Sequence, residues 1–173
     1  MDNQQGKTTE VLLAWIAGFM DGEGTFVLAH HSQRAYPYPQ VSVNNTHFPT
    51  LPWFTNALDR LGLPYYVVPL KPGYLGKDGF RRKPQWAIQM FGYKRCERWC
   101  RALVPYLVTR REQAELMLEY INSRMSRNPA KGGRWRDDVG LTPREAEIAD
   151  RLYGGHRRPG NPRSKPSQTT RRT

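Results

Sequence analysis

Residues 14–26, AWIAGFMDGEGTF, place two carboxylates among glycines at the end of an apolar segment. The segment Val11–Met20 is too short to span a membrane, which takes about 20 residues. Asp21 and Glu23 follow it directly, in a chain whose formal net charge is +12. Because a helix carries partial negative charge at its C-terminus, acids there are unfavourable unless a cation binds them. A plain glycine-rich turn is the alternative that Asp-Gly-Glu-Gly leaves open by itself.

The composition favours one folded domain with a polyanionic partner. The chain has 173 residues, of which 38% are hydrophobic, and 27 Lys and Arg against 15 Asp and Glu. This excess of positive charge indicates binding to nucleic acid or to an acidic membrane surface. We expect a single domain over residues 1–155. Residues 156–173 contain basic residues but no acid, and we predict that they form a flexible basic tail.

Hydrophobic periodicity predicts an α+β domain with a four-stranded antiparallel sheet. The expected strands cover residues 25–29, 40–44, 65–70 and 85–91, and the expected helices cover residues 8–20, 53–61, 94–104, 110–125 and 142–153. Gly62 is expected to end the second helix. Capping boxes are predicted at Thr109–Glu112 and at Thr142–Glu145. Cys96 and Cys100 lie four residues apart, which favours two buried, reduced thiols on one helical face.

One face of the predicted sheet carries amide and hydroxyl side chains that are suited to reading base edges in a DNA groove. These residues are Gln40, Ser42, Asn44, Gln85 and Gln89. Further candidate DNA contacts lie in the loops and at strand ends, where phosphates would be met: His31, Gln33, Arg34, Lys71, Lys77, Arg81, Arg82 and Lys83. An ordinary solvated sheet face is the alternative interpretation.

Small residues form a stripe along the first predicted helix. Ala14, Gly18 and Gly22 recur every four residues, and such a stripe allows a second helix to approach closely. The remaining faces of this helix are apolar, so we expect the whole helix to be buried, one side against its own core. If the second helix belongs to another copy of the chain, the acids of both copies meet and could hold two metal ions.

The segment LLAWIAGFMDGEGTF closely resembles the signature of the LAGLIDADG homing endonucleases. The wider resemblance covers about residues 10–125 and includes VSVNNTHF and ALVPYLVTRREQAELML. It implies the αββαββα fold of that family, in which the motif helices pack together and their terminal acids bind Mg²⁺ for DNA cleavage. Since this chain has one motif, the resemblance implies a homodimer joined through Ala14, Gly18 and Gly22.

The resemblance also assigns roles to individual residues. Glu23 corresponds to the metal-binding acid, with the carbonyl of Gly22 as a second ligand, and Asp21 to the other, structural acid. Asn45, or its neighbour Thr46, falls where the family has a polar residue that positions water. Arg110 falls where the family usually has Lys; because Arg does not release its proton, only charge stabilisation is expected there.

The sequence therefore predicts a homodimeric, Mg²⁺-dependent endonuclease that cuts a long pseudo-palindromic double-stranded DNA target. Ca²⁺ or Mn²⁺ is expected to substitute in binding. The N-terminus has no feature of a targeting peptide, which indicates a soluble intracellular protein, either in a prokaryotic cytoplasm or nucleoid or in an organelle matrix, without a membrane partner. The alternative function is that of a nuclease-inactive RNA maturase or DNA-binding protein.

Overall fold

The computed structural model describes residues 2–30, 36–71, 73–76, 78–127 and 139–154. Its elements occur in this order: α1 (Asp2–Glu23), β1 (Gly24–Ala29), β2 (Tyr38–Asn45), α2 (Thr50–Arg60), β3 (Tyr66–Lys71), β4 (Gln85–Phe91), α3 (Tyr93–Leu103), α4 (Arg111–Arg127) and α5 (Pro143–Gly154). The expected αββαββα order is confirmed and is continued by α4 and α5. The first helix begins at Asp2, well before the expected residue 8.

The strands form one antiparallel sheet with the order β1-β2-β4-β3, as the alternating pattern predicts. Ser42 of the central strand β2 lies opposite Thr25 of β1 and Gln89 of β4. Side chains two residues apart share a face, so this register determines which side chains point toward the helices and which point away from them.

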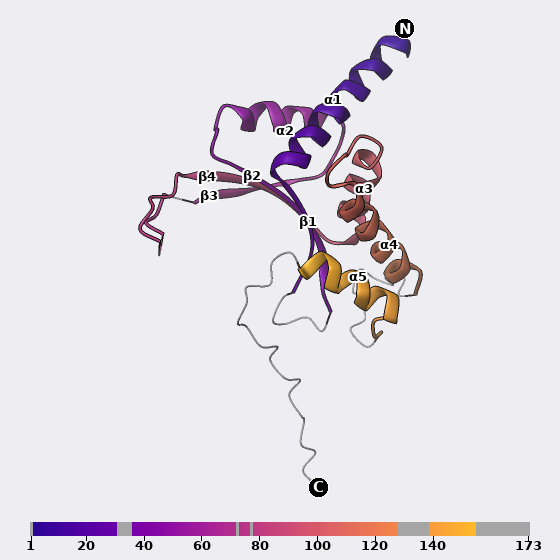
Figure 1. Ribbon diagram of the computed structural model, residues 1–173. Helices are drawn as coiled ribbons and strands as arrows, with labels where there is room; N and C mark the ends of the chain where they lie inside the picture. The colour runs from indigo at the N-terminus through magenta and orange to yellow at the C-terminus, as the bar shows by residue number, and fades with distance from the viewer. Residues whose placement is uncertain (1, 31–35, 72, 77, 128–138, 155–173) are drawn as a thin grey trace.

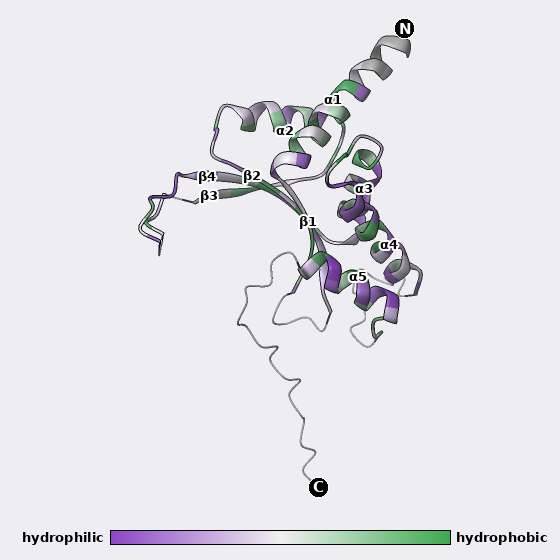
Figure 2. Cartoon of the chain, in the orientation of Figure 1, coloured by the Kyte–Doolittle hydropathy of each residue, from purple (hydrophilic) through white to green (hydrophobic). Residues whose placement is uncertain are grey.

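Apolar residues of alternate strand positions form the core under the helices, including Leu28, Val41, Val43, Trp86 and Ile88, all with no exposed surface. Helices α1 and α2 lie on one side of the sheet, and α3 and α4 lie beside it (Figure 1). The helices carry both hydrophobic and hydrophilic segments (Figure 2), as expected of helices that pack on one side only.

Aromatic contacts fix α1 to α2 and to the sheet. The ring centroid of Phe19 lies 5.2 Å from that of Phe54. The same ring stacks on Trp86, with 6.3 Å between the ring centroids. The indole nitrogen of Trp86 donates a hydrogen bond of 2.9 Å to the carbonyl of His47, so its polar atom is satisfied within the core.

Gly62 ends α2, as predicted. Its φ is 60°, a conformation that side chains disfavour. The amide of Gly62 donates to Asp59 and that of Leu63 donates to Leu58, which is the Schellman arrangement.

The two cysteines are buried free thiols on α3, in agreement with the sequence. Burial raises the pKa of Cys96 to about 12, so this side chain stays protonated and behaves as a small apolar residue.

The capping box of the last helix is confirmed and joins α5 to α4. The amide of Glu145 donates to Thr142 Oγ1 at 3.1 Å, and the amide of Thr142 donates back to the Glu145 carboxylate at 2.9 Å. Glu145 is fully buried, accepts a hydrogen bond of 2.7 Å from Ser123, and forms an ion pair with Arg127. Within the described ranges, the helices lack the combination of length and apolar character that a membrane span requires.

The junction between α1 and β1 generates the first prediction. A side chain at Gly24 would place its Cβ 2.5 Å from the carbonyl oxygen of Met20, whereas a Cβ at Gly6 meets nothing within 4 Å. Gly24→Ala should therefore lower the free energy of unfolding by about 1–3 kcal/mol. The control Gly6→Ala should raise it by about 0.5–1 kcal/mol, because alanine favours the helix. Urea unfolding measures both, and a Gly24→Ala variant as stable as wild type would contradict the close contact.

Candidate active site

The two acids at the end of α1 have different surroundings. Asp21 Oδ1 accepts a hydrogen bond of 2.8 Å from the amide of Arg110, and its Oδ2 accepts one of 2.8 Å from the amide of Val108. The hydroxyl of Thr109 donates to Oδ1 at 3.1 Å and lies 3.2 Å from the carbonyl oxygen of Asp21. Asp21 thus anchors the segment that leads into α4, and both of its carboxylate oxygens accept hydrogen bonds there.

The capping box predicted at Thr109–Glu112 is wrong for this reason. The hydroxyl of Thr109 donates to Asp21, Glu112 forms an ion pair with Arg151 of α5, and α4 begins at Arg111. The ionised carboxylate of Asp21 is a strong acceptor for the hydroxyl of Thr109, and the amides that bind it, those of Val108 and Arg110, precede α4.

The electrostatic state of Asp21 follows from these contacts. Partial burial raises its pKa, but the hydrogen bonds from the amides of Arg110 and Val108 and from Thr109 outweigh burial, so the pKa of Asp21 lies below its usual value. The structural role that the resemblance implies for Asp21 agrees with this arrangement.

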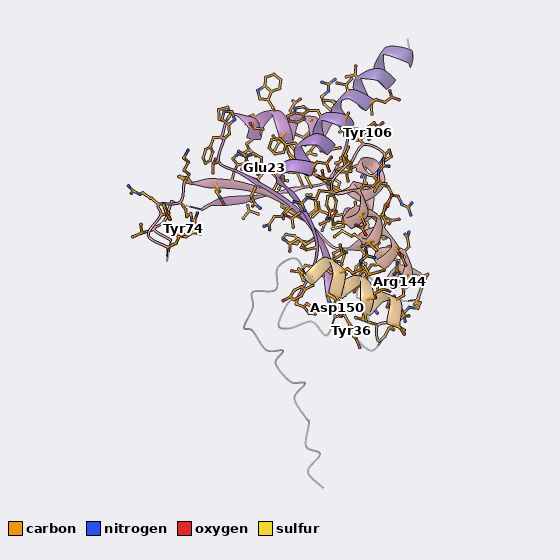
Figure 3. The ribbon with its side chains drawn as sticks, viewed as in Figure 1. Glu23, Tyr36, Tyr74, Tyr106, Arg144 and Asp150 are labelled. Carbon is orange, nitrogen blue, oxygen red and sulfur yellow. The ribbon has the colours of Figure 1, made fainter. Side chains whose placement is uncertain are left out.

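Glu23, by contrast, is exposed and makes no hydrogen bond or ion pair with any described residue. It lies where α1 meets the sheet (Figure 3), next to the equally exposed Gly22. Carboxylate and carbonyl oxygens are the hard donors that Mg²⁺ and Ca²⁺ prefer, so these two residues fit such an ion. Across the described ranges, no group of three or more His, Cys, Asp or Glu side chains is placed to hold a metal ion.

Arg110 is brought next to this helix end through its backbone. Its backbone amide donates a hydrogen bond to Asp21, which lies two residues before Glu23 in the chain. The side chain of Arg110 is half-buried. The guanidinium Nε is enclosed without a hydrogen-bond partner, and no described residue forms an ion pair with Arg110. A cation without a counterion at this position is available to a phosphate.

Asn45 is the last residue of β2 and lies at the end of the sheet where α1 joins β1, because Gly24 lies opposite Val43. Its Oδ1 accepts a hydrogen bond of 2.7 Å from the amide of His47, which shapes the turn before α2. The role of Asn45 in positioning water stays a prediction. His47 is an exposed polar residue near this end of the sheet that the sequence analysis did not select. Its ring nitrogen Nδ1 lies 2.7 Å from Thr50 Oγ1. The position of this histidine just after a predicted strand could have indicated it as a candidate site residue.

The residues expected on the polar face of the sheet do share one face. The register places Ser42 beside Gln89. Gln40 and Asn44 lie two positions from Ser42 along β2, and Gln85 lies four positions from Gln89 along β4. Asn44 and Gln85 are exposed, and Gln40 and Gln89 are partly exposed. The expectation of an exposed Ser42 is wrong, because cross-strand neighbours on both sides leave it only 7% exposed.

The basic loop between β3 and β4 forms a small projecting hairpin, at whose end Tyr74 is labelled in Figure 3. Leu75 and Arg81 form an isolated β-bridge, and Arg82 forms an ion pair with Asp78. Arg82 is exposed and paired with Asp78, and its contact with a phosphate stays a prediction. Arg81 and Lys83 are exposed without described partners.

Several predicted DNA contacts cannot be placed. His31, Gln33, Arg34 and Lys77 lie outside the described residues, as does the tail after residue 154, and Lys71 is described only as the last residue of β3.

The stripe of small residues on α1 is exposed in the single chain, so its burial against a second helix stays a prediction. A Cβ added at Gly18 or Gly22 would meet nothing within 4 Å. Val11 and Trp15 flank the stripe and are 67% and 41% exposed. The opposite side of the helix, which includes Ile16, is buried, so α1 has one face in the core and one exposed face.

Comparison with solved structures identifies the fold. The chain matches the homing endonuclease I-CvuI in complex with its target in the presence of calcium with a TM-score of 0.52 and 19% identity, covering 84% of this chain and 96% of that chain. A second I-CvuI complex, with the I-CreI target left uncleaved in the presence of magnesium, matches with a TM-score of 0.49 and 20% identity over 86% and 98% of the two chains. The sequence matches no protein-family model and no curated protein. The chain has the homing-endonuclease fold, which confirms the resemblance at that level.

The contacts of Asp21 generate a second prediction. Asp21→Ala should lower the free energy of unfolding at pH 7 by about 2–3 kcal/mol, because the amides of Val108 and Arg110 lose their acceptor. The matched control Glu23→Ala removes an exposed, unpartnered acid and should change the stability by less than about 0.5 kcal/mol. Equal losses in the two variants, measured by urea unfolding, would contradict the division of roles.

The lowered pKa gives this effect a pH dependence. The stabilisation by Asp21 should be complete above its ordinary pKa of about 4 and should disappear as the pH falls through the lower pKa of the folded state. The stability difference between wild type and Asp21→Asn should therefore shrink between pH 5 and strongly acidic conditions. A difference that grows on acidification would contradict the assignment.

Proposed function

We propose that two copies of this chain form a site-specific, divalent-metal-dependent endonuclease that cuts double-stranded DNA. One observation carries the proposal: of two acids at the end of α1, Asp21 is engaged by backbone amides, whereas Glu23 is exposed and unpartnered. An unsatisfied carboxylate at a helix C-terminus is electrostatically unfavourable, and a bound divalent cation removes that cost.

The dimer is supported by the exposed stripe Ala14, Gly18 and Gly22. Since a Cβ at Gly18 or Gly22 would meet no atom of another described element within 4 Å, a second α1 has room to approach along this face. Val11 and Trp15 would lose their exposed apolar surface in that contact. A two-fold arrangement also places the two Glu23 residues near one axis, and it gives the DNA target matching half-sites.

The donor set supports Mg²⁺ as the cofactor. Glu23 of each copy and the carbonyl of Gly22 would hold the ion, together with oxygens of water and DNA. When bound, the ion supplies an activated water for attack on the phosphodiester and stabilises the developing negative charge. Arg110 stabilises that charge from the protein side, and it does so without giving up a proton.

The open face of the sheet supports DNA as the substrate. Asn44, Gln85 and Gln89 present amide groups that can read base edges in the major groove. Arg81 and Lys83 lie beyond them in the hairpin, where they can contact phosphates. The formal net charge of +12 strengthens association with a polyanion.

Replacement of Glu23 tests the proposed chemistry. Duplexes that the wild type cleaves in Mg²⁺ are first selected from a randomised library. Glu23→Gln should reduce the single-turnover rate on the selected duplex by at least about a thousandfold, because the charged ligand is lost, and should leave the affinity in Ca²⁺ unchanged or tighter. The control Glu10→Gln removes another exposed acid of α1 and should cleave at the wild-type rate.

Cleavage by Glu23→Gln at the wild-type rate would contradict the assignment of the metal ligand. If the wild type binds duplex DNA but selects no cleavable sequence in Mg²⁺ or Mn²⁺, the protein is a binder and the proposed endonuclease activity is wrong.

The dimer gives a further prediction. Gly18→Leu should convert the dimer into a monomer, because a bulky side chain prevents close approach of the helices, while the circular dichroism of the folded chain stays unchanged. Sedimentation velocity at micromolar concentration measures the oligomeric state, with Gly6→Leu as the matched control. A dimeric Gly18→Leu variant would contradict an interface along this stripe.

A further inference from the structure

Two buried polar atoms on the α4 side of the candidate active site lack hydrogen-bond partners. One is the guanidinium Nε of Arg110, a donor, and the other is the side-chain oxygen Oε1 of Gln113, an acceptor. Buried groups of this kind are rare in folded proteins, and they are costly unless they serve a purpose.

The two atoms are complementary and close along the chain. Arg110 directly precedes α4, and its carbonyl accepts a hydrogen bond of 3.1 Å from the amide of Ala114 in the first turn. Residues three apart across a helical turn are neighbours, so we expect the side chains of Arg110 and Gln113 to be within reach of each other. Ala114 and Met117, which continue the same side of α4, are fully buried. Gln113 thus lies on the side of α4 that turns toward the core, and Arg110 directly precedes this helix, where its amide donates to Asp21.

We propose that Gln113 is a positioning residue that orients the guanidinium of Arg110 toward the scissile phosphate. Gln113 Oε1 accepts the Nε hydrogen of Arg110 when DNA is bound. This contact leaves the four N–H groups of the guanidinium tip for the phosphate, in the forked geometry that suits its oxygens. Arg110 is then held at both ends, its backbone by Asp21 and its side chain by Gln113. The inference rests on the proposed function, because it takes the phosphate of DNA as the ligand.

This arrangement explains why the two atoms are unpaired in the free chain. Forming the pair costs the side-chain freedom of Arg110, and the phosphate contact provides the compensating interaction. Placing the guanidinium within a fraction of an ångström of the reacting group matters because small misplacements have large effects on rate.

A double-mutant cycle tests the proposal. Gln113→Met has a similar size but no strong acceptor, and it should lower the single-turnover cleavage rate of a selected duplex about tenfold. In an Arg110→Met background, the same change at Gln113 should alter the rate less than about twofold, because the group it positions is gone. The control Leu118→Met is a mild change at a partly buried residue of α4 and should cleave like wild type.

A binding measurement without metal provides the second readout. In EDTA, the slope of log K against log salt concentration for a random-sequence duplex should fall by about 0.9 per subunit in Arg110→Met, since one phosphate contact is lost. Gln113→Met should show the same decrease, whereas a purely structural role for Gln113 would leave the slope unchanged.

The outcomes separate this inference from the proposed function. If Gln113→Met cleaves at the wild-type rate, or if its loss is undiminished in the Arg110→Met background, Gln113 does not act through Arg110. If the wild type cleaves no duplex, the proposed endonuclease is wrong and the salt slopes decide alone: equal decreases support the Arg110–Gln113 pair, and an unchanged slope in Gln113→Met overturns it.

Discussion

The hydrogen bonds between Asp21 and the amides of Val108 and Arg110 determine how the parts of the candidate site lie together. They join the end of α1, where β1 begins, to the start of α4, a segment nearly ninety residues further along the chain. Because the acceptor is ionised and receives several donors, this joint is stronger than a single neutral hydrogen bond. The position of Arg110 beside the end of α1 depends on it, and so does the path of the chain between α3 and α4.

The same joint separates the roles of two neighbouring acids. The negative charge of Asp21 meets backbone amides at the start of α4, where a helix carries partial positive charge. Glu23 follows two residues later and has no such compensation among the described residues. One acid therefore maintains the fold, and the other remains available to a cation. The face of α1 that carries Gly18 is exposed in the single chain, so the proposed metal site and the proposed dimer would share one helix.

Local patterns predicted much of this fold. Strand β4 was expected at residues 85–91 and lies at Gln85–Phe91, because alternation of apolar and polar residues specifies a half-buried strand directly. Gly62 ends α2 for an equally local reason. What the sequence could not supply were contacts between distant residues. No rule based on local spacing predicts that Asp21 binds Val108, Thr109 and Arg110. The hydrogen bond from Thr109 to Asp21 also replaces the capping box that was predicted at Thr109. The burial of Ser42 depends on which strands flank β2, and the orphaned atoms of Arg110 and Gln113 appear only once α4 is packed.

The most direct test of the separate roles of Asp21 and Glu23 is a crystal structure of the protein with a selected duplex in Mn²⁺, whose anomalous scattering locates the ions. We expect metal density within bonding distance of the Glu23 carboxylate, while Asp21 still accepts the hydrogen bonds from Val108 and Arg110. Metal bound to Asp21, with the amides of Val108 and Arg110 released and Glu23 away from the ion, would contradict the account.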